Sequence, residues 1–244
     1  MKETINKDTY QTLKEVKINA EAHEKAIAPM WKPKDTKKEY SGISINICTP
    51  VHSECSIHYT QALLEFQKLC FEKRIKVNFS LVKSSLVTQG RNLCVAGFLE
   101  SNYTHLVFID SDIYFNSKSI LKMLERDKDV ISIPYPLKTV MWDKTMDRIE
   151  KGEIKNIKEL KSSFNTYPMR VEEDDNIKVN EGVIEVTHSP TGCMMIKRSV
   201  FDKLIKSYPD KSIVQKTVIN GKYVDRPHMW NFFDTMHDPD TKTY

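Results

Sequence analysis

Two aspartates, Asp110 and Asp112, follow directly on an apolar run in the segment HLVFIDSDIY. Removing carboxylates from water costs free energy unless a cation meets them, so this pair requires a cationic partner. Carboxylates one residue apart can face one shared ion, and Mg²⁺ and Mn²⁺ prefer such oxygen ligands. The spacing therefore predicts a divalent-metal site that can also hold a diphosphate. The plainer alternative is that one aspartate caps the following turn and the other faces solvent.

The segments around this pair alternate between strand and helix periodicity. We expect strands at 43–49 (ended by Pro50), 75–82, 105–109, 130–133, 182–188 and 192–197, and helices at 56–73, 89–101, 117–127 and 199–207. This order predicts an α/β fold with a mainly parallel central sheet flanked by helices. Ligands of such sheets bind at the carboxyl ends of the strands, which is where both aspartates are expected.

Outside this series, the chain predicts an N-terminal extension and an insertion. Residues 1–40 are polar, with a helical pattern at 9–28 followed by a basic linker, and 41–244 is expected to form a single domain. A charged helical stretch at 145–163 and an acidic turn at 172–176 indicate an insertion at about 140–180. The last thirty-odd residues are expected to be irregular.

Composition excludes several classes of function. The net charge of +4 is far from the signature of a nucleic-acid-binding protein. The five cysteines form no CxxC pair, which predicts reduced thiols and no zinc site. The N-terminus lacks the apolar core of a signal peptide and no stretch reaches transmembrane length, so we expect a cytoplasmic protein.

At this point the chain resembles a known family. VFIDSDIYF is similar to the DxD segment of glycosyltransferases with the GT-A (nucleotide-diphospho-sugar transferase) fold, of the family 2-like kind. Four other segments resemble parts of that Rossmann-like architecture in the same order: ISINICTPVHSECS, QGRNLCVAGFLESNY, VISIPYPLK and SPTGCMMIKRSVFDKL. The resemblance covers about 43–204, less the insertion.

The resemblance implies a metal-dependent glycosyltransferase that uses Mn²⁺ or Mg²⁺. It implies a nucleotide-sugar donor, with UDP- and GDP-sugars foremost, and a carbohydrate-type acceptor on a glycan, lipid or protein. Asp112 would ligate the metal, and Asp110 would bind the donor ribose or reach the metal through water. The other implied donor- and acceptor-binding residues are Thr49, Pro50, Val51, Arg91, Asn92, Ser111, Lys138 and Gly192. For Arg91, Asn92, Lys138 and Gly192, an ordinary role at a helix end, on the surface or in a turn stays an alternative.

The chain departs from the family's pattern near its end. Related enzymes carry an acidic catalytic residue and a metal-binding histidine beyond an aromatic stretch like WNFFDT. Here Asp234 is the nearest candidate for the base, and His237 or His228 for the metal ligand.

Two other classes of function stay open. In a phosphatase or phosphotransferase of the haloacid-dehalogenase type, Asp110 would be the nucleophile, although Tyr114 stands where that family expects Thr or Val. A protein of the same fold could also bind nucleotide sugars without turnover.

Overall fold

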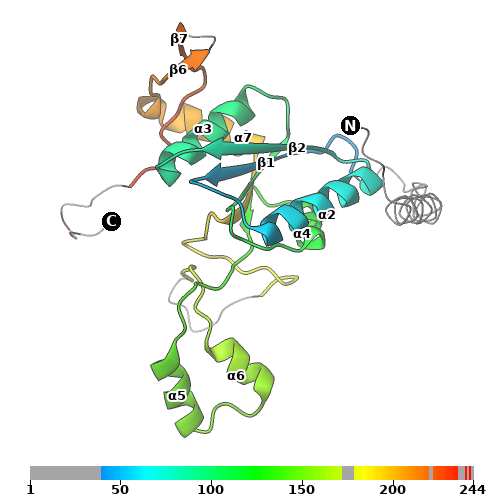
Figure 1. The fold of residues 1–244 in the computed structure, drawn as a ribbon, viewed down its shortest axis with the longest axis vertical. Coiled ribbons are helices and arrows are strands. Elements are labelled where there is room, and N and C mark those ends of the chain that lie inside the picture. The colour runs from blue at the N-terminus through cyan, green and yellow to red at the C-terminus, as the bar shows by residue number, and fades with distance from the viewer. Residues whose placement is uncertain (1–39, 172–178, 220–221, 236–239, 241, 243–244) are drawn as a thin grey trace, which may run out of the picture. The chain divides into compact units, whose positions relative to one another are not determined.

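The computed structural model describes residues 40–171, 179–219, 222–235, 240 and 242, all within the unit Tyr40–Tyr244. Figure 1 shows the arrangement of its helices and strands. The helix expected at 9–28 and the acidic turn at 172–176 lie outside the described residues. The predicted boundary at residue 40 therefore stays a prediction.

A five-stranded sheet forms the centre of this unit, in the order β2-β1-β3-β5-β4. Its strands are β1 (Ser44–Val51), β2 (Lys76–Lys83), β3 (His105–Ile109), β4 (Val130–Ser132) and β5 (Cys193–Lys197). β1 pairs parallel with β2 and β3, whereas β5 runs antiparallel between β3 and β4. The α/β class is confirmed, with a sheet that is mixed rather than wholly parallel.

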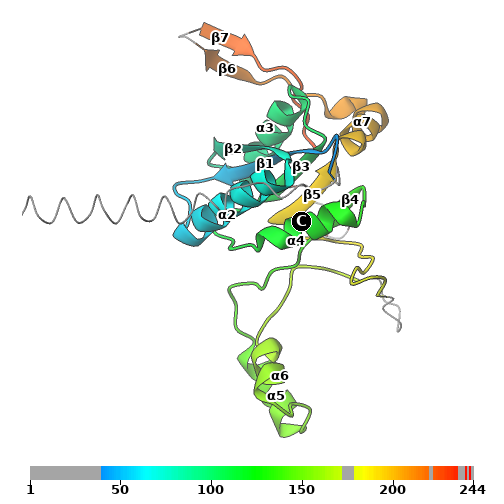
Figure 2. The same cartoon turned by 90° about the vertical axis from the view of Figure 1, so that its right-hand side faces the viewer.

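Helices cover both faces of this sheet (Figure 2). α2 (Ile57–Lys73) and α4 (Ser117–Glu125) lie on one face, and α3 (Val87–Leu99) and α7 (Arg198–Ser207) lie on the other. The chain steps outward from β1 to β2 and then crosses back over β1 to reach β3. Because parallel crossovers keep one hand, this reversal places α2 and α3 on opposite faces. In α/β sheets, ligands bind beyond the carboxyl ends of the strands at such a reversal, which here lies between β1 and β3.

Strand alternation divides the core into two layers. Ile47 and Val107 point toward α2 and α4, while Cys48 and Phe108 point toward α3 and α7. Both layers are fully buried at these positions. The strands carry apolar side chains on both faces because the sheet is covered on both.

The helix ends follow from local sequence. The Ser56 side chain accepts a hydrogen bond from the Tyr59 N–H at the start of α2, and Asn116 caps α4 through the Lys118 N–H. Both are preferred N-cap residues because their side chains satisfy a free backbone donor. Of the two residues that the sequence offers as the N-cap of α4, Asn116 and Ser117, the cap is Asn116.

Three secondary-structure predictions are wrong. β1 does not stop before Pro50 but continues to Val51, and Pro50 pairs with Val82 of β2. This is tolerated because the ladder between β1 and β3 already ends at Cys48, so Pro50 has one neighbouring strand only.

The stretch 182–188 forms no strand. It takes part only in isolated bridges, between Asn180 and Val183 and between Arg170 and His188. Its residues do alternate between apolar and polar, but among the described residues no strand lies alongside to complete a ladder. The chain end, in turn, is not wholly irregular, because β6 (Lys216–Ile219) and β7 (Lys222–Asp225) form an antiparallel hairpin.

The charged stretch of the insertion forms two helices, α5 (Trp142–Glu150) and α6 (Ile157–Ser163). The Thr145 hydroxyl donates to the Ser163 carbonyl, and the Trp142 and Phe164 rings meet edge to face at 5.1 Å. The predicted helical pair is confirmed. In the part of the chain that the structure describes, no helix is long and apolar enough to cross a membrane.

Replacing Phe66 by alanine tests the packing of α2 on the sheet. Phe66 is fully buried and touches Phe115 edge to face at 6.2 Å. We expect Phe66→Ala to lower the free energy of unfolding by about 3–5 kcal/mol in urea titrations, because it leaves a cavity in the core. Leu64→Ala, on the exposed side of the same helix, should cost no more than about 0.5 kcal/mol. Equal losses for the two variants would contradict this orientation of α2.

Candidate active site at the carboxyl end of β3

The first aspartate of the pair meets a buried arginine. The Arg91 guanidinium, on α3, lies 2.9 Å from the Asp110 carboxylate and donates a second bond of 3.3 Å to the Thr191 carbonyl. Its charged end also lies over the Phe108 ring, 5.2 Å from the centroid. The Arg91 side chain is only 7% exposed, against 29% for Asp110. The cation that the sequence required for Asp110 is therefore supplied by the protein itself.

Gly192 makes room for this carboxylate. A Cβ at Gly192 would lie 2.7 Å from Asp110 Oδ2 and about as close to the Tyr135 ring, with the Tyr135 hydroxyl closer still. The Gly192 carbonyl accepts a hydrogen bond of 2.9 Å from the Asp110 N–H. Burial, and then the negative charge of Asp110, raise the pKa of Tyr135. Because Gly192 has no side chain, both the Tyr135 side chain and the Asp110 carboxylate fit beside its Cα atom.

The second aspartate has a different environment. The Lys138 ammonium lies 2.6 Å from Asp112 Oδ2, and the two side chains are 85% and 51% exposed. The hydrogen bond to Asp112 raises the pKa of Lys138. An ion pair this exposed contributes little to stability, so a ligand can replace it at low cost.

The last residues of β1 and the loop that follows them pack beside the aspartate pair. Thr49 is fully buried and its hydroxyl is hydrogen-bonded to the Tyr59 hydroxyl on α2, while Pro50 is buried and Val51 is half-buried. The loop that follows β1 is tied to the aspartate pair, because the Ser56 N–H donates to the Ser111 carbonyl at 2.8 Å. The resemblance implies that Thr49, Pro50 and Val51 border the donor nucleoside, and Val51 is the most accessible of the three.

Asn92 connects this edge of the sheet to the chain end. Its side-chain amide donates to the Asn231 side chain and to the Phe233 carbonyl, and it accepts from the Phe233 N–H, each at 2.9 Å. The Phe233 ring packs edge to face on Phe108 at 5.2 Å. The segment that carries Asp234 is thus brought beside α3 and the end of β3.

The residues present fit a metal ion only together with a substrate. Among the described residues, no three His, Cys, Asp or Glu side chains gather closely enough to hold a metal. Mg²⁺, however, is commonly bound through one or two carboxylates, with water and substrate phosphates completing its shell. The half-exposed Asp112 suits that arrangement better than Asp110, which Arg91 already holds. The predicted ligand His237 lies outside the described residues.

Sequence reasoning missed three side chains of this edge. Tyr135 was not assigned a role, although its segment, IPYPLK, was noted. Asn231 was also missed, because its partner Asn92 lies 139 positions earlier, and so was Tyr59, whose hydroxyl bonds Thr49 across the loop between β1 and α2. The hairpin β6–β7 did have a signal, since Asn220-Gly221 is the strongest turn pair for a two-residue hairpin loop.

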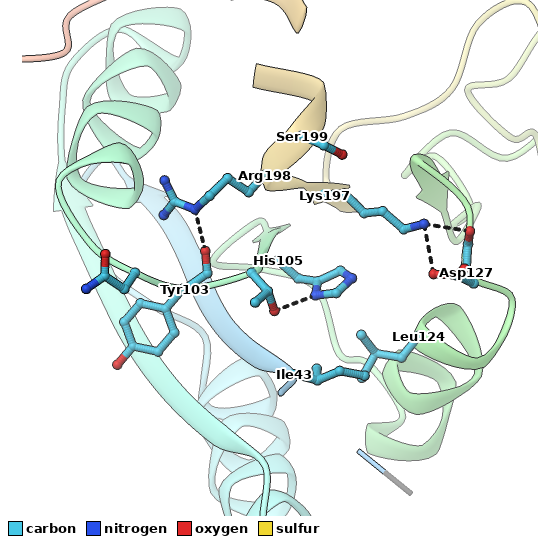
Figure 3. A pocket seen from close by; sticks show the side chains of 10 residues that line it. Ile43, Tyr103, His105, Leu124, Asp127, Lys197, Arg198 and Ser199 are labelled. Atoms are coloured by element: carbon cyan, nitrogen blue, oxygen red, sulfur yellow. Dashed lines mark hydrogen bonds and ion pairs between the residues drawn. The ribbon is translucent and has the colours of Figure 1, made fainter. Parts of the chain in front are cut away.

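A hollow of about 390 Å³ lies at the opposite edge of the sheet, beside the first residues of β1 and β3 (Figure 3). Its three charged side chains are bound to one another or to backbone groups. Lys197 binds Asp127 at 2.8 Å, and the Arg198 guanidinium donates to three carbonyls, those of Phe98, Ser101 and Tyr103. This hollow therefore serves the packing of α3 and α7 rather than the aspartate pair.

Gly192→Ala tests the shared space at Asp110. We expect this variant to lower the free energy of unfolding by about 1–3 kcal/mol, because the new methyl group overlaps Asp110 and Tyr135. Gly97→Ala is the matched control: its Cβ would find only the Arg226 side chain at 3.5 Å, and alanine favours the helix α3. Chemical denaturation should therefore show a loss at 192 and none at 97. Unchanged stability of Gly192→Ala would contradict the packing described.

His105, in the hollow of Figure 3, makes a pH-dependent contribution to stability. Burial, and then the charge of Lys197, lower its pKa from the ordinary value of 6.5. The unfolded chain therefore takes up this proton first as the pH falls, and stability is lost below about pH 6.5. We expect His105→Gln to lose less stability than the wild type between pH 7.5 and pH 5.5 in urea titrations. Identical profiles for the wild type and His105→Gln would refute the assignment.

Comparisons with known proteins leave the family of this chain open. No protein-family model matches the sequence, and no curated protein matches it either. Among solved structures, the crystal structure of A197 from STIV is 17% identical over a match that covers 66% of this chain and 68% of that chain, with a TM-score of 0.39. A likeness at this level carries no argument about function.

Proposed function

We propose that this chain is a metal-dependent glycosyltransferase of the GT-A type, which moves a sugar from a nucleotide-diphosphate donor to an acceptor hydroxyl. The observation that carries the proposal is the setting of the aspartate pair. Asp110 and Asp112 follow β3 at the point where the strand order reverses, with Arg91 fixed on one and Lys138 on the other. Crevices at such reversals are where α/β sheets bind nucleotides.

Each residue of the edge then has a task. Asp112 would hold Mn²⁺ or Mg²⁺ with the donor diphosphate, and the ion would neutralise charge on the leaving group. Lys138, displaced from Asp112, would pair with a phosphate oxygen, since its ammonium is exposed. Asp110, held by Arg91, would face the ribose, and Val51 would border the base.

The acceptor side is assigned to Asp234. In a direct displacement, the acceptor oxygen bonds to the anomeric carbon as the bond from that carbon to the phosphate oxygen breaks. The acceptor proton would pass to the Asp234 carboxylate, and the nucleoside diphosphate would leave. Asp234 is exposed and therefore open to an acceptor.

The geometry does not favour the phosphatase alternative. Arg91 neutralises the charge that a nucleophilic Asp110 would need, whereas a hydrogen bond to a ribose hydroxyl requires only the second carboxylate oxygen. Binding without turnover remains a distinct outcome of the experiments on this site.

Donor binding through Asp112 can be measured directly. In a thermal-shift screen with UDP-, GDP-, CMP- and dTDP-sugars plus Mn²⁺, we expect the wild type to be stabilised by at least one donor, by about 2.7 kcal/mol at one hundred times its Kd. Asp112→Asn should abolish the Mn²⁺-dependent part of that shift. Asp129→Asn, beside Lys197 and Lys203 just before β4, should keep it. An unchanged shift in Asp112→Asn, or no shift with any donor in the wild type, would refute the proposed function.

A further inference from the structure

The stretch Met229–Asp234 is hydrogen-bonded to the rest of the protein through side-chain amides. We call this stretch the C-terminal strap. We propose that Asn92 and Asn231 are positioning residues, which hold the Asp234 carboxylate at the acceptor side of the site. This inference rests on the proposed function, because it assigns a role in the same reaction.

The first fastening is the Asn92 amide, which is only 3% exposed. Its three bonds of 2.9 Å include a reciprocal pair with the N–H and the carbonyl of Phe233. A buried amide costs free energy unless its donors and acceptor are satisfied, so Asn92 has one favourable orientation. The backbone of the strap at Phe233 is fixed in the same way.

Apolar contacts hold the strap beside the aspartate pair. The Phe233 ring lies on Phe108, the ring on which the Arg91 guanidinium also rests. Because the same Arg91 guanidinium binds Asp110, the contact with Phe108 places the strap near that carboxylate. The start of the strap is fixed separately, by the buried Met229.

The second set of hydrogen bonds, made by Asn231, includes the Asp234 carboxylate itself. Asn231 accepts a bond from Asn92 and donates from Nδ2 to Asp234 Oδ2 at 2.7 Å. The other oxygen, Oδ1, accepts from the Thr235 N–H at 2.8 Å. Hydrogen bonds to a charged acceptor are stronger than neutral ones, so this carboxylate is oriented although it is exposed.

Arg91 and Asn92, which are adjacent in α3, therefore position two different aspartates. Arg91 fixes Asp110 on the donor side, and Asn92 fixes Asp234 through Asn231 on the acceptor side. One turn of α3 thus sets the distance between the two halves of the site. A general base misplaced by 1 Å can cost about a hundredfold in rate, which gives these two amides a measurable role.

A double-mutant cycle on the full chain tests this role. The probe reaction is Mn²⁺-dependent hydrolysis of UDP-glucose and GDP-mannose, in which water takes the place of the acceptor. We expect Asn231→Ala to lower kcat about 10- to 100-fold while the KM for the donor stays within twofold. Asp234→Asn should have the lowest kcat of the single variants. Adding Asn231→Ala to it should cause no further loss of kcat, because Asn231 acts only through that carboxylate.

A variant of Asn92 and a control variant at another buried amide complete the experiment. Asn92→Asp keeps the shape and the acceptor of the Phe233 N–H but loses both donated bonds, including the one to Asn231, so it should lower kcat as Asn231→Ala does. Asn46→Ala removes a buried amide of β1 that bonds Asn78 and Ser80, and it should keep the wild-type kcat. Wild-type kcat in Asn231→Ala, or losses that add in the double variant, would overturn the inference while leaving the proposed function intact. A folded wild type that hydrolyses neither probe and binds no donor would instead overturn the proposed function.

Discussion

The ion pair between Arg91 and Asp110 is the interaction on which the rest of this site depends. A carboxylate at the end of a buried strand needs a cation, and Arg91 supplies it from α3 through a guanidinium that also bonds Thr191 and covers Phe108. Removing either partner would leave the other charged and largely buried, which is far more costly than losing an exposed pair. The pair therefore fixes the distance from α3 to β3, and with it the frame for Asp112 and the C-terminal strap.

The two aspartates, one residue apart, are thereby given different properties. Asp110 is held by a buried arginine and by the space that Gly192 leaves open, so it is rigid. Among the described residues, Asp112 is paired with the exposed ammonium of Lys138, on the segment that leads into α5. A rigid carboxylate suits the recognition of a neutral group such as a ribose, whereas an accessible one suits an ion that arrives with its substrate. The division of roles in our proposal follows from this difference in burial.

The sequence predicted most of the frame and only part of the site. Apolar periodicity located the helices and the strands of the sheet, because burial on two faces leaves a strong pattern. It failed at 182–188, since alternation cannot reveal whether a neighbouring strand exists, and at Pro50, where the missing ladder partner is a property of β3. The bond from Asn92 to Phe233 spans 141 positions, and no local pattern records it. The proximity of Tyr135 to Asp110, which depends on the missing side chain at Gly192, likewise leaves no local pattern in the sequence.

The most direct measurement of the central claim is paramagnetic broadening by Mn²⁺ in the NMR spectrum of the amide-labelled protein, titrated with Mn²⁺ in the presence of UDP or GDP. The account predicts that the amide signals of Ser111 and Asp112 broaden first, followed by that of Gly192. The signals of His105 and Ser199, at the opposite edge of the sheet, should stay sharp. Broadening that begins elsewhere, or none with either nucleotide, would contradict a metal-and-diphosphate site at the end of β3.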